Sequence, residues 1–270
     1  MSRIAERFAE LRRREERALI PFVTAGDPDL DTSEALVLAM VEAGADLIEI
    51  GVPFSDPIGE GPTIQRASER ALASGVTLRR VLQLVKVLRP RVEVPLLLMG
   101  YANPFFAMGC AAFAAAAREV GVDGIIVADL PPQEGEPLYA ACRTAGIDPV
   151  LLAAPTTTDE RLALLVRESR GFLYYVSLTG VTGARRELAQ GIERSVRAAQ
   201  ALSKLPVCVG FGIATKEHAA QVGAYADGVV VGSAIVDRIE QSRSREQAVD
   251  AVADFVAMLK QPLSGGGVQD

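Results

Sequence analysis

Three features of the sequence predict an α/β fold of the (β/α)8 barrel type. Eight short, apolar, β-branched segments alternate with longer segments whose apolar residues have helical spacing. The strand candidates are apolar at successive positions, which suits a parallel sheet covered by helices on its outer face. Eight such units in about 250 residues match the size of a (β/α)8 barrel. A doubly wound sheet is the alternative, but no G-x-G-x-x-G motif opens the chain.

The eight expected strands follow one another along the whole chain. They cover residues 18–26, 46–54, 94–101, 123–131, 148–155, 171–180, 206–212 and 227–236. Several follow a glycine that would end the preceding helix, as in Gly44-Ala45-Asp46 and Gly121-Val122-Asp123. The opening MSRIAERFAELRRREER is charged and amphipathic, which predicts an extra N-terminal helix rather than a signal peptide.

No composition break or Pro/Ser-rich linker divides the sequence. Residues 1–260 are therefore expected to form a single domain. The remaining QPLSGGGVQD, residues 261–270, is expected to be a disordered tail.

Charge and composition exclude several classes of protein. The 270 residues include 28 Lys and Arg against 34 Asp and Glu, a net charge of −6. This balance argues against nucleic-acid binding, which needs a basic face. No apolar segment approaches the ~20 residues of a membrane span, so no membrane partner is expected. Three widely separated cysteines indicate a cytoplasmic protein rather than a disulfide framework.

The scarcity of two residue types restricts the possible chemistry. The single histidine, His218, cannot by itself build a metal cluster, and none of the cysteines looks like its catalytic partner. The four lysines all lie at helix or helix-end positions, so none is placed on a strand to form a Schiff base. Catalysis must therefore rely mainly on carboxylates, hydroxyls and backbone groups, with no metal.

Glycine-rich segments follow the last three expected strands. Gly210-Phe211-Gly212 and Gly232-Ser233-Ala234 each leave backbone N–H groups unobstructed beside a helix start. Loops after the seventh and eighth strands are the usual phosphate site of a (β/α)8 barrel. The alternative is that these glycines only make tight turns. A third segment, residues 179–183, could close over a ligand.

Glu49 is the most unusual residue of the second expected strand. It lies among apolar neighbours, where an unpaired charge would cost several kcal/mol. It could belong to an interior ion pair, or it could be a carboxyl whose pKa is raised by burial for acid/base work. The Pro- and Gly-rich loop that follows supplies two more carboxylates, Asp56 and Glu60. In the sixth strand, one of Tyr174 and Tyr175 must point into the barrel.

Several motifs together closely resemble the tryptophan synthase alpha chain. They are IEIGVPFSDPIGEGPTIQRA (48–67), GFLYYVSLTGVTGAR (171–185), VGFGI (209–213) and VVGSAIV (230–236). The resemblance covers nearly the whole chain. It implies a barrel that cleaves indole-3-glycerol phosphate to indole and glyceraldehyde 3-phosphate without a cofactor. It also implies an α2β2 complex with a beta chain, which condenses the indole with serine using pyridoxal phosphate.

The resemblance also assigns roles to individual residues. The catalytic residues would be Glu49, Glu60 and Tyr174. The substrate-binding residues would be Phe22, Met99 and Tyr101 around the indole, with Thr182, Gly183, Phe211, Gly212, Gly232 and Ser233 near the phosphate. Glu60 departs from the pattern, because much of the family has Asp at this position.

The residue inventory supports this chemistry on its own. Cleavage of this C–C bond is a retro-aldol reaction, and the chain lacks both a strand lysine and a zinc site for it. Indole can act as its own electron sink once ring carbon 3 is protonated, so two carboxylates suffice.

Three alternatives remain open from the sequence. They are a free-standing lyase, a catalytically weak barrel that activates a beta chain, and another phosphate-binding barrel such as an isomerase or the indole-glycerol phosphate synthase. Prolines and phenylalanines at 53–54, 103–105 and 131–132 are expected to be exposed beside the active site, as in a protein interface.

Overall fold

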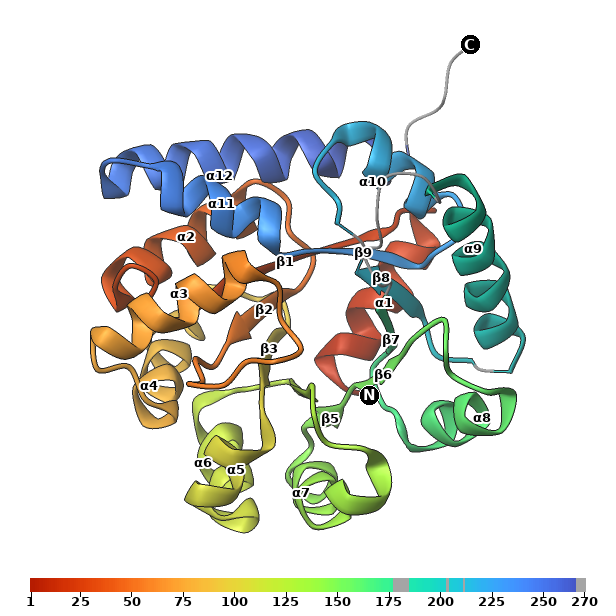
Figure 1. Cartoon of the computed structure of the whole chain (residues 1–270), viewed down its shortest axis with the longest axis horizontal. Helices are drawn as coiled ribbons and strands as arrows, with labels where there is room; N and C mark the ends of the chain where they lie inside the picture. The colour runs from red at the N-terminus through yellow and green to blue at the C-terminus, as the bar shows by residue number, and fades with distance from the viewer. Residues whose placement is uncertain (177–184, 203, 211, 266–270) are drawn as a thin grey trace.

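The strands of the chain form a closed parallel barrel (Figure 1). The computed structural model describes residues 1–176, 185–202, 204–210 and 212–265. Neighbouring strands pair in the order β5-β4-β3-β2-β1-β9-β8-β7-β6, and every pair is parallel. The strands are β1 (Ala18–Thr24), β2 (Ile48–Gly51), β3 (Leu96–Gly100), β4 (Gly124–Val127), β5 (Asp148–Pro149), β6 (Leu151–Ala153), β7 (Leu173–Val176), β8 (Val207–Gly210) and β9 (Gly228–Val231).

β5 and β6 are two halves of one barrel strand. Only Val150 separates them, and its N–H donates to the carbonyl of Ile125 at 2.9 Å, which continues the ladder to β4. The first half pairs with β4 and the second with β7, so this broken strand closes the ring. The eight predicted strands are therefore confirmed. Among the described residues each strand is shorter than predicted, because its polar or glycine-containing ends belong to loops.

Helices surround the barrel on its outer side (Figure 1). Apolar residues of these helices pack against the outward-facing strand residues in the main hydrophobic core. The helices are α2 (Leu30–Glu42), α3 (Pro62–Ala73), α4 (Leu78–Leu88), α5 (Ala102–Met108), α6 (Cys110–Val120), α7 (Pro132–Ala145), α8 (Asp159–Glu168), α9 (Arg185–Leu202), α10 (Lys216–Gly223), α11 (Ser233–Gln241) and α12 (Arg245–Lys260).

The predicted N-terminal helix, α1 (Arg3–Arg13), covers the N-terminal end of the barrel. Its apolar residues Ile4, Phe8 and Leu11 are buried in the same cluster as the inward-facing residues of the strands. The rings of Phe8 and Phe172 lie 5.8 Å apart. Because α1 fills this end, ligands can enter the interior only from the opposite, C-terminal end of the strands.

Aspartates that precede strands hold the N-terminal end of the barrel together. Asp46, Asp123 and Asp227 each come just before a strand, and each accepts a backbone N–H from the start of the adjacent strand. The donors are Leu19 at 2.7 Å, Leu96 at 2.9 Å and Val207 at 2.9 Å. The aspartates thus fix strand ends that the sheet ladder alone would leave free to fray.

Asp46 is the most constrained of these aspartates. It is fully buried, and it pairs with Arg7 of α1 at 2.7 Å and with Lys260 of α12 at 2.8 Å. One carboxylate therefore connects the first and last helices to the barrel.

The prediction that residues 261–270 form a disordered tail is wrong for the first of these residues. Gln261–Leu263 form a short 3-10 helix, and Leu263 is buried. The carbonyl of Leu263 accepts the N–H of Arg17 at 2.8 Å. The burial of this leucine against Gly223 of α10 outweighs the polar composition around it. Residues 266–270 lie outside the described part of the chain.

Asp46→Asn should lower the free energy of unfolding by about 3–5 kcal/mol, because it leaves two partly buried cations without their shared anion. Glu193→Gln is the matched control, since it removes an exposed pair with Arg197 and should cost at most about 0.5 kcal/mol. Urea unfolding at neutral pH measures both. Equal losses in the two variants would contradict a structural role for Asp46.

Candidate active site

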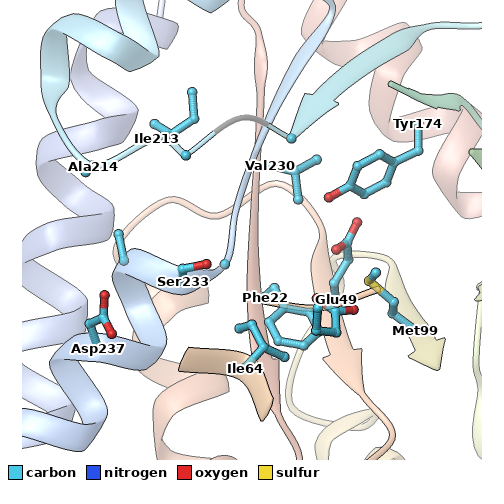
Figure 2. Close-up of a pocket in the computed structure, with 15 residues that line it drawn as sticks. Phe22, Glu49, Ile64, Met99, Tyr174, Ile213, Ala214, Val230, Ser233 and Asp237 are labelled. Carbon is cyan, nitrogen blue, oxygen red and sulfur yellow. The ribbon is translucent and has the colours of Figure 1, made fainter. Parts of the chain in front are cut away.

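A cavity of ≈ 340 Å³ opens at the C-terminal end of the strands (Figure 2). Residues from β1, β2, β3, β7, β8 and β9 and from the loops that follow them line it, so the barrel brings together segments far apart in the chain. The lining residues are Phe22, Glu49, Glu60, Ile64, Met99, Tyr174, Gly210, Gly212, Ile213, Ala214, Val230, Gly232, Ser233, Ala234 and Asp237.

Eight of the predicted site residues line this one cavity. They are Phe22, Glu49, Glu60, Met99, Tyr174, Gly212, Gly232 and Ser233. Tyr101 lines a smaller, adjoining cavity instead. Thr182, Gly183 and Phe211 lie outside the described residues.

Glu49 is a fully buried carboxyl in the middle of β2. Its neighbours in register are Phe22 on β1 and Leu97 on β3, both apolar. Neither carboxyl oxygen has a hydrogen-bond partner among the described residues, so the interior ion pair considered from the sequence is not present there. Burial raises the pKa of Glu49 well above its ordinary value, and the nearby Glu60 raises it further. The barrel therefore keeps this group as a neutral acid.

Glu60 reaches the same cavity from the loop between β2 and α3. Its backbone is held by two hydrogen bonds: its N–H donates to Pro57 at 3.0 Å, and its carbonyl accepts from Gln65 Nε2 at 2.9 Å. Burial raises the pKa of the Glu60 carboxyl as well. Asp56, the other acid of this loop, is exposed and accepts a hydrogen bond from Ser55. The loop thus offers one carboxylate to the cavity.

Tyr174 is the inward-facing member of the tyrosine pair. Its hydroxyl points toward the carboxyl of Glu49 (Figure 2). Burial raises the pKa of Tyr174 well above its ordinary value, and ionisation of Glu49 raises it further, so the phenol stays protonated. A Cβ at Gly210 would lie 2.5 Å from this hydroxyl, so the residue beside it must be glycine. Tyr175 packs into the outer core.

An apolar wall lines one side of the cavity. Phe22, Ile64 and Met99 pack together there, and Val230 lies beyond them. A Cβ at Gly51 would lie 2.5 Å from the Phe22 ring, so this glycine allows the ring to lie against β2. A flat aromatic ligand would fit this wall, with both carboxyls within reach.

The other side of the cavity is built from backbone rather than cations. α11 begins at Ser233 with Gly232 as its N-cap, and the first N–H groups of a helix have no partner within it. They and the helix dipole attract an anion. Gly212 and Ala214 face them from the loop after β8. None of the described lining residues is Lys or Arg, and Lys216 instead donates to Gln261 at 2.8 Å.

Several lining residues of the cavity were not predicted from the sequence. Ile64, Ile213, Ala214 and Val230 are apolar, and nothing in their local pattern separates them from core residues. Asp237 lies on the second turn of α11, where its carboxylate accepts from Thr63 Oγ1 at 2.9 Å. Its place at the cavity depends on the position of α11 over the barrel, which no local motif encodes.

The described residues contain neither a candidate metal site nor a candidate membrane span. No group of three or more His, Cys, Asp or Glu side chains is placed to hold a metal ion there. In the same part of the chain, no helix is long and apolar enough to cross a membrane.

Acidic groups beside an aromatic-sized wall, at the C-terminal ends of the strands, are typical of an enzyme of the (β/α)8 class. The family model described as "Tryptophan synthase alpha chain" matches residues 8–263. The chain belongs to the tryptophan synthase alpha chain family, whose members catalyse the cleavage of indole-3-glycerol phosphate in tryptophan biosynthesis.

Individual relatives agree with the family model. A tryptophan synthase alpha chain from Geobacter sp. (strain M21) is 50% identical over 266 residues, which cover 98% of this chain and 99% of the relative. One from Citrifermentans bemidjiense is 51% identical with the same coverage. The crystal structure of the alpha chain from Legionella pneumophila has a TM-score of 0.90 at 38% identity, with 99% of each chain covered. A tryptophan synthase structure from M. tuberculosis has a TM-score of 0.89 at 36% identity and covers 98% of this chain and 100% of its own.

Glu49→Gln should stabilise the protein increasingly as pH rises above about 4.5. The folded-state pKa of Glu49 is raised, so the wild type is most stable below the unfolded pKa of about 4.3 and loses stability until the pH passes the folded value. Gln does not ionise, so the variant does not lose stability in this way as pH rises. Over this range the difference should grow by up to about 1.4 kcal/mol per pH unit. Urea unfolding at several pH values between 5 and 8 measures it, and a constant difference would contradict the raised pKa.

Proposed function

We propose that Glu49 and Glu60 perform the acid/base chemistry by which this chain cleaves indole-3-glycerol phosphate to indole and glyceraldehyde 3-phosphate. The observation that carries the proposal is the fully buried, unpaired carboxyl of Glu49, which shares a cavity with a second carboxyl and an anion-binding helix N-terminus. A purely structural carboxyl would have a hydrogen-bond partner, as Asp46 does.

The cavity favours one orientation of the substrate. The phosphate binds the N–H groups at the start of α11 and the backbone near Gly212, and the indole ring packs against Phe22 and Met99. The glycerol carbons then lie between the two ends, beside Glu49. This places the C–C bond to be broken next to the neutral acid.

The raised pKa of Glu49 suits the first step. Its proton passes to carbon 3 of the indole, which gives an indolenine cation. The resulting carboxylate then takes the proton of the glycerol hydroxyl on the carbon attached to the ring. The C–C bond breaks, its electron pair returns to the ring, and the hydroxyl carbon becomes the aldehyde of glyceraldehyde 3-phosphate. Glu49 ends the cycle protonated, so the protons balance.

Glu60 and Tyr174 support this step. Glu60, ionised, accepts a hydrogen bond from the ring N–H and offsets the positive charge of the cation. Tyr174, held protonated, donates to Glu49 once that carboxyl has lost its proton. The alpha chain needs no cofactor for this reaction, and pyridoxal phosphate belongs to the beta chain.

The tryptophan synthase alpha chain forms a complex with the beta chain. We propose an α2β2 complex that uses the C-terminal face of the barrel. The side chains expected there need correction: Phe105 is fully buried against Phe113, because residues 102–108 form α5 rather than a loop. Pro53 and Pro132 are buried too.

Two other apolar side chains are exposed at this face. Ile58, in the loop before α3, is 87% exposed, and Phe106 on α5 is 41% exposed. Because they lie beside the cavity that releases indole, we propose that they contact the beta chain. This supports a partnered enzyme over a free-standing lyase.

We also propose that residues 1–260 act as one domain in the cytoplasm. A single ring of strands with α1 and α12 tied to Asp46 supports the domain assignment. The three cysteines are free thiols, which supports a reducing compartment.

Glu49→Gln should lower kcat for indole release by about 10²–10⁴-fold, because one carboxyl serves two proton transfers. The assay measures indole from indole-3-glycerol phosphate with and without a beta chain. Retention of more than about a tenth of wild-type activity would remove Glu49 from the mechanism. If wild type released indole only in trace amounts even with the beta chain, the barrel would be an activating subunit.

Gly232→Val should raise KM about tenfold or more, since a branched side chain at the N-cap of α11 obstructs the N–H groups that bind phosphate. Lys216→Ala is the control and should leave KM nearly unchanged, because Lys216 pairs with Gln261. Steady-state kinetics of indole release measures both. A larger effect of Lys216→Ala would mean that a cationic side chain, not the backbone, binds the phosphate.

A further inference from the structure

A second, small cavity adjoins the main one beneath the loop between β2 and α3. Its volume is ≈ 20 Å³, and three hydroxyl-bearing residues, Thr24, Ser68 and Tyr101, line it. Glu60 lines both cavities, so its side chain forms part of the wall between them. The small cavity therefore offers hydroxyl groups on the side of Glu60 that faces away from the substrate.

Thr24 has a buried hydroxyl that takes no part in the proposed cleavage steps. It ends β1, it is 2% exposed, and its Oγ1 is buried with no hydrogen-bond partner among the described residues. A buried hydroxyl without a partner costs about 1–3 kcal/mol. The other buried threonine of the described residues, Thr32, donates to Asp29 at 3.0 Å, so an orphan threonine is not the rule in this chain.

Tyr101 offers a second hydroxyl from the opposite wall. Its oxygen accepts the N–H of Gly59 at 3.0 Å, which leaves its own proton free for another acceptor. Its ring stacks on Phe54 with 5.2 Å between centroids, so its position is fixed. Burial, together with the charge of Glu60, raises the pKa of Tyr101 to about 12, so the hydroxyl keeps its proton.

We propose that Thr24 and Tyr101 are positioning residues, whose hydroxyls donate to the carboxylate of Glu60 when one of its oxygens turns into the small cavity. This inference rests on the proposed role of Glu60 in the cleavage reaction. Two donors on one carboxylate oxygen leave the other oxygen free to accept the ring N–H of the indole. They also stabilise the ionised form, which the buried loop by itself disfavours.

The size of the cavity agrees with this occupant. A space of ≈ 20 Å³ holds about one water-sized group, and a carboxylate oxygen has that size. A single water molecule is the competing occupant, and it would satisfy Thr24 without any effect on Glu60. The two cases differ in what the loss of the threonine hydroxyl does to the ionisation of Glu60.

Other ionisable groups face Glu60 and must be held constant in the test. They are Glu49 on β2, Tyr174 on β7 and Asp237 on α11, with Asp129 close to Tyr101. Thr24→Val changes none of these charges and keeps the shape of the side chain. It is therefore the variant of choice, and Tyr101→Phe is the second.

The experiment is the pH profile of kcat for indole release by the alpha chain in complex with a beta chain. Removal of a donor to the ionised carboxylate raises its pKa, so Thr24→Val should move the acidic limb upward by about one pH unit. On that limb it should lower kcat by up to about tenfold, with little change in KM. Tyr101→Phe should shift the limb in the same direction. Thr32→Val is the matched control, because it removes a buried threonine hydroxyl that lines neither cavity and should lower stability without moving the limb.

A double-mutant cycle separates the inference from the function on which it rests. In the Glu60→Gln background, Thr24→Val should no longer move the acidic limb of kcat, because the amide at position 60 does not ionise. If Glu60→Gln lowers kcat but Thr24→Val leaves the acidic limb in place, water occupies the cavity and the inference is overturned. If Glu60→Gln itself retains full activity, the proposed role of Glu60 fails.

A ¹³C NMR titration of the Glu60 carboxyl in the free alpha chain gives a readout without turnover. An unchanged pKa of Glu60 in both Thr24→Val and Tyr101→Phe would also overturn the inference.

Discussion

The burial of an unpaired carboxyl inside a ring of parallel strands is the constraint on which the active end of this protein depends. Glu49 lies between apolar neighbours on β1 and β3, and no described cation or donor reaches it. Ionisation in such a place is costly, so the group stays protonated at a pH where an exposed glutamate would not. The barrel thereby turns an ordinary carboxylate into an acid suited to protonating a carbon atom.

The N-terminal end of the barrel stabilises the fold, and the C-terminal end holds the candidate active site. At the N-terminal end, Asp46 and Asp123 are satisfied by strand N–H groups and by cations from α1, α12 and Arg89. At the C-terminal end, Glu49 and Thr24 are buried without partners among the described residues. Unsatisfied polar groups cost stability, and the paired charges at the opposite end offset that cost.

The proposed anion site uses backbone groups in place of charged side chains. No described lining residue carries a positive charge, and the N-terminus of α11 supplies the donors instead. This agrees with a chain of net charge −6, in which the proposed phosphate site relies on backbone N–H groups. A cation in this cavity would favour the ionised form of Glu49 and so weaken it as an acid.

The sequence by itself determined the barrel, its N-terminal helix, the acid at position 49 and the glycine segments of the anion site. These follow from local properties: alternation of apolar segments, a carboxyl among them, and glycines at strand ends. Only the tertiary structure decided which tyrosine faces the cavity, that Phe105 is buried in α5, that Leu263 anchors the last turn, and that Thr24, Ile64 and Asp237 border the site. These features depend on the stagger of the strands and on how each helix lies over the barrel. Such long-range packing cannot be predicted from the residues that flank each position in the sequence.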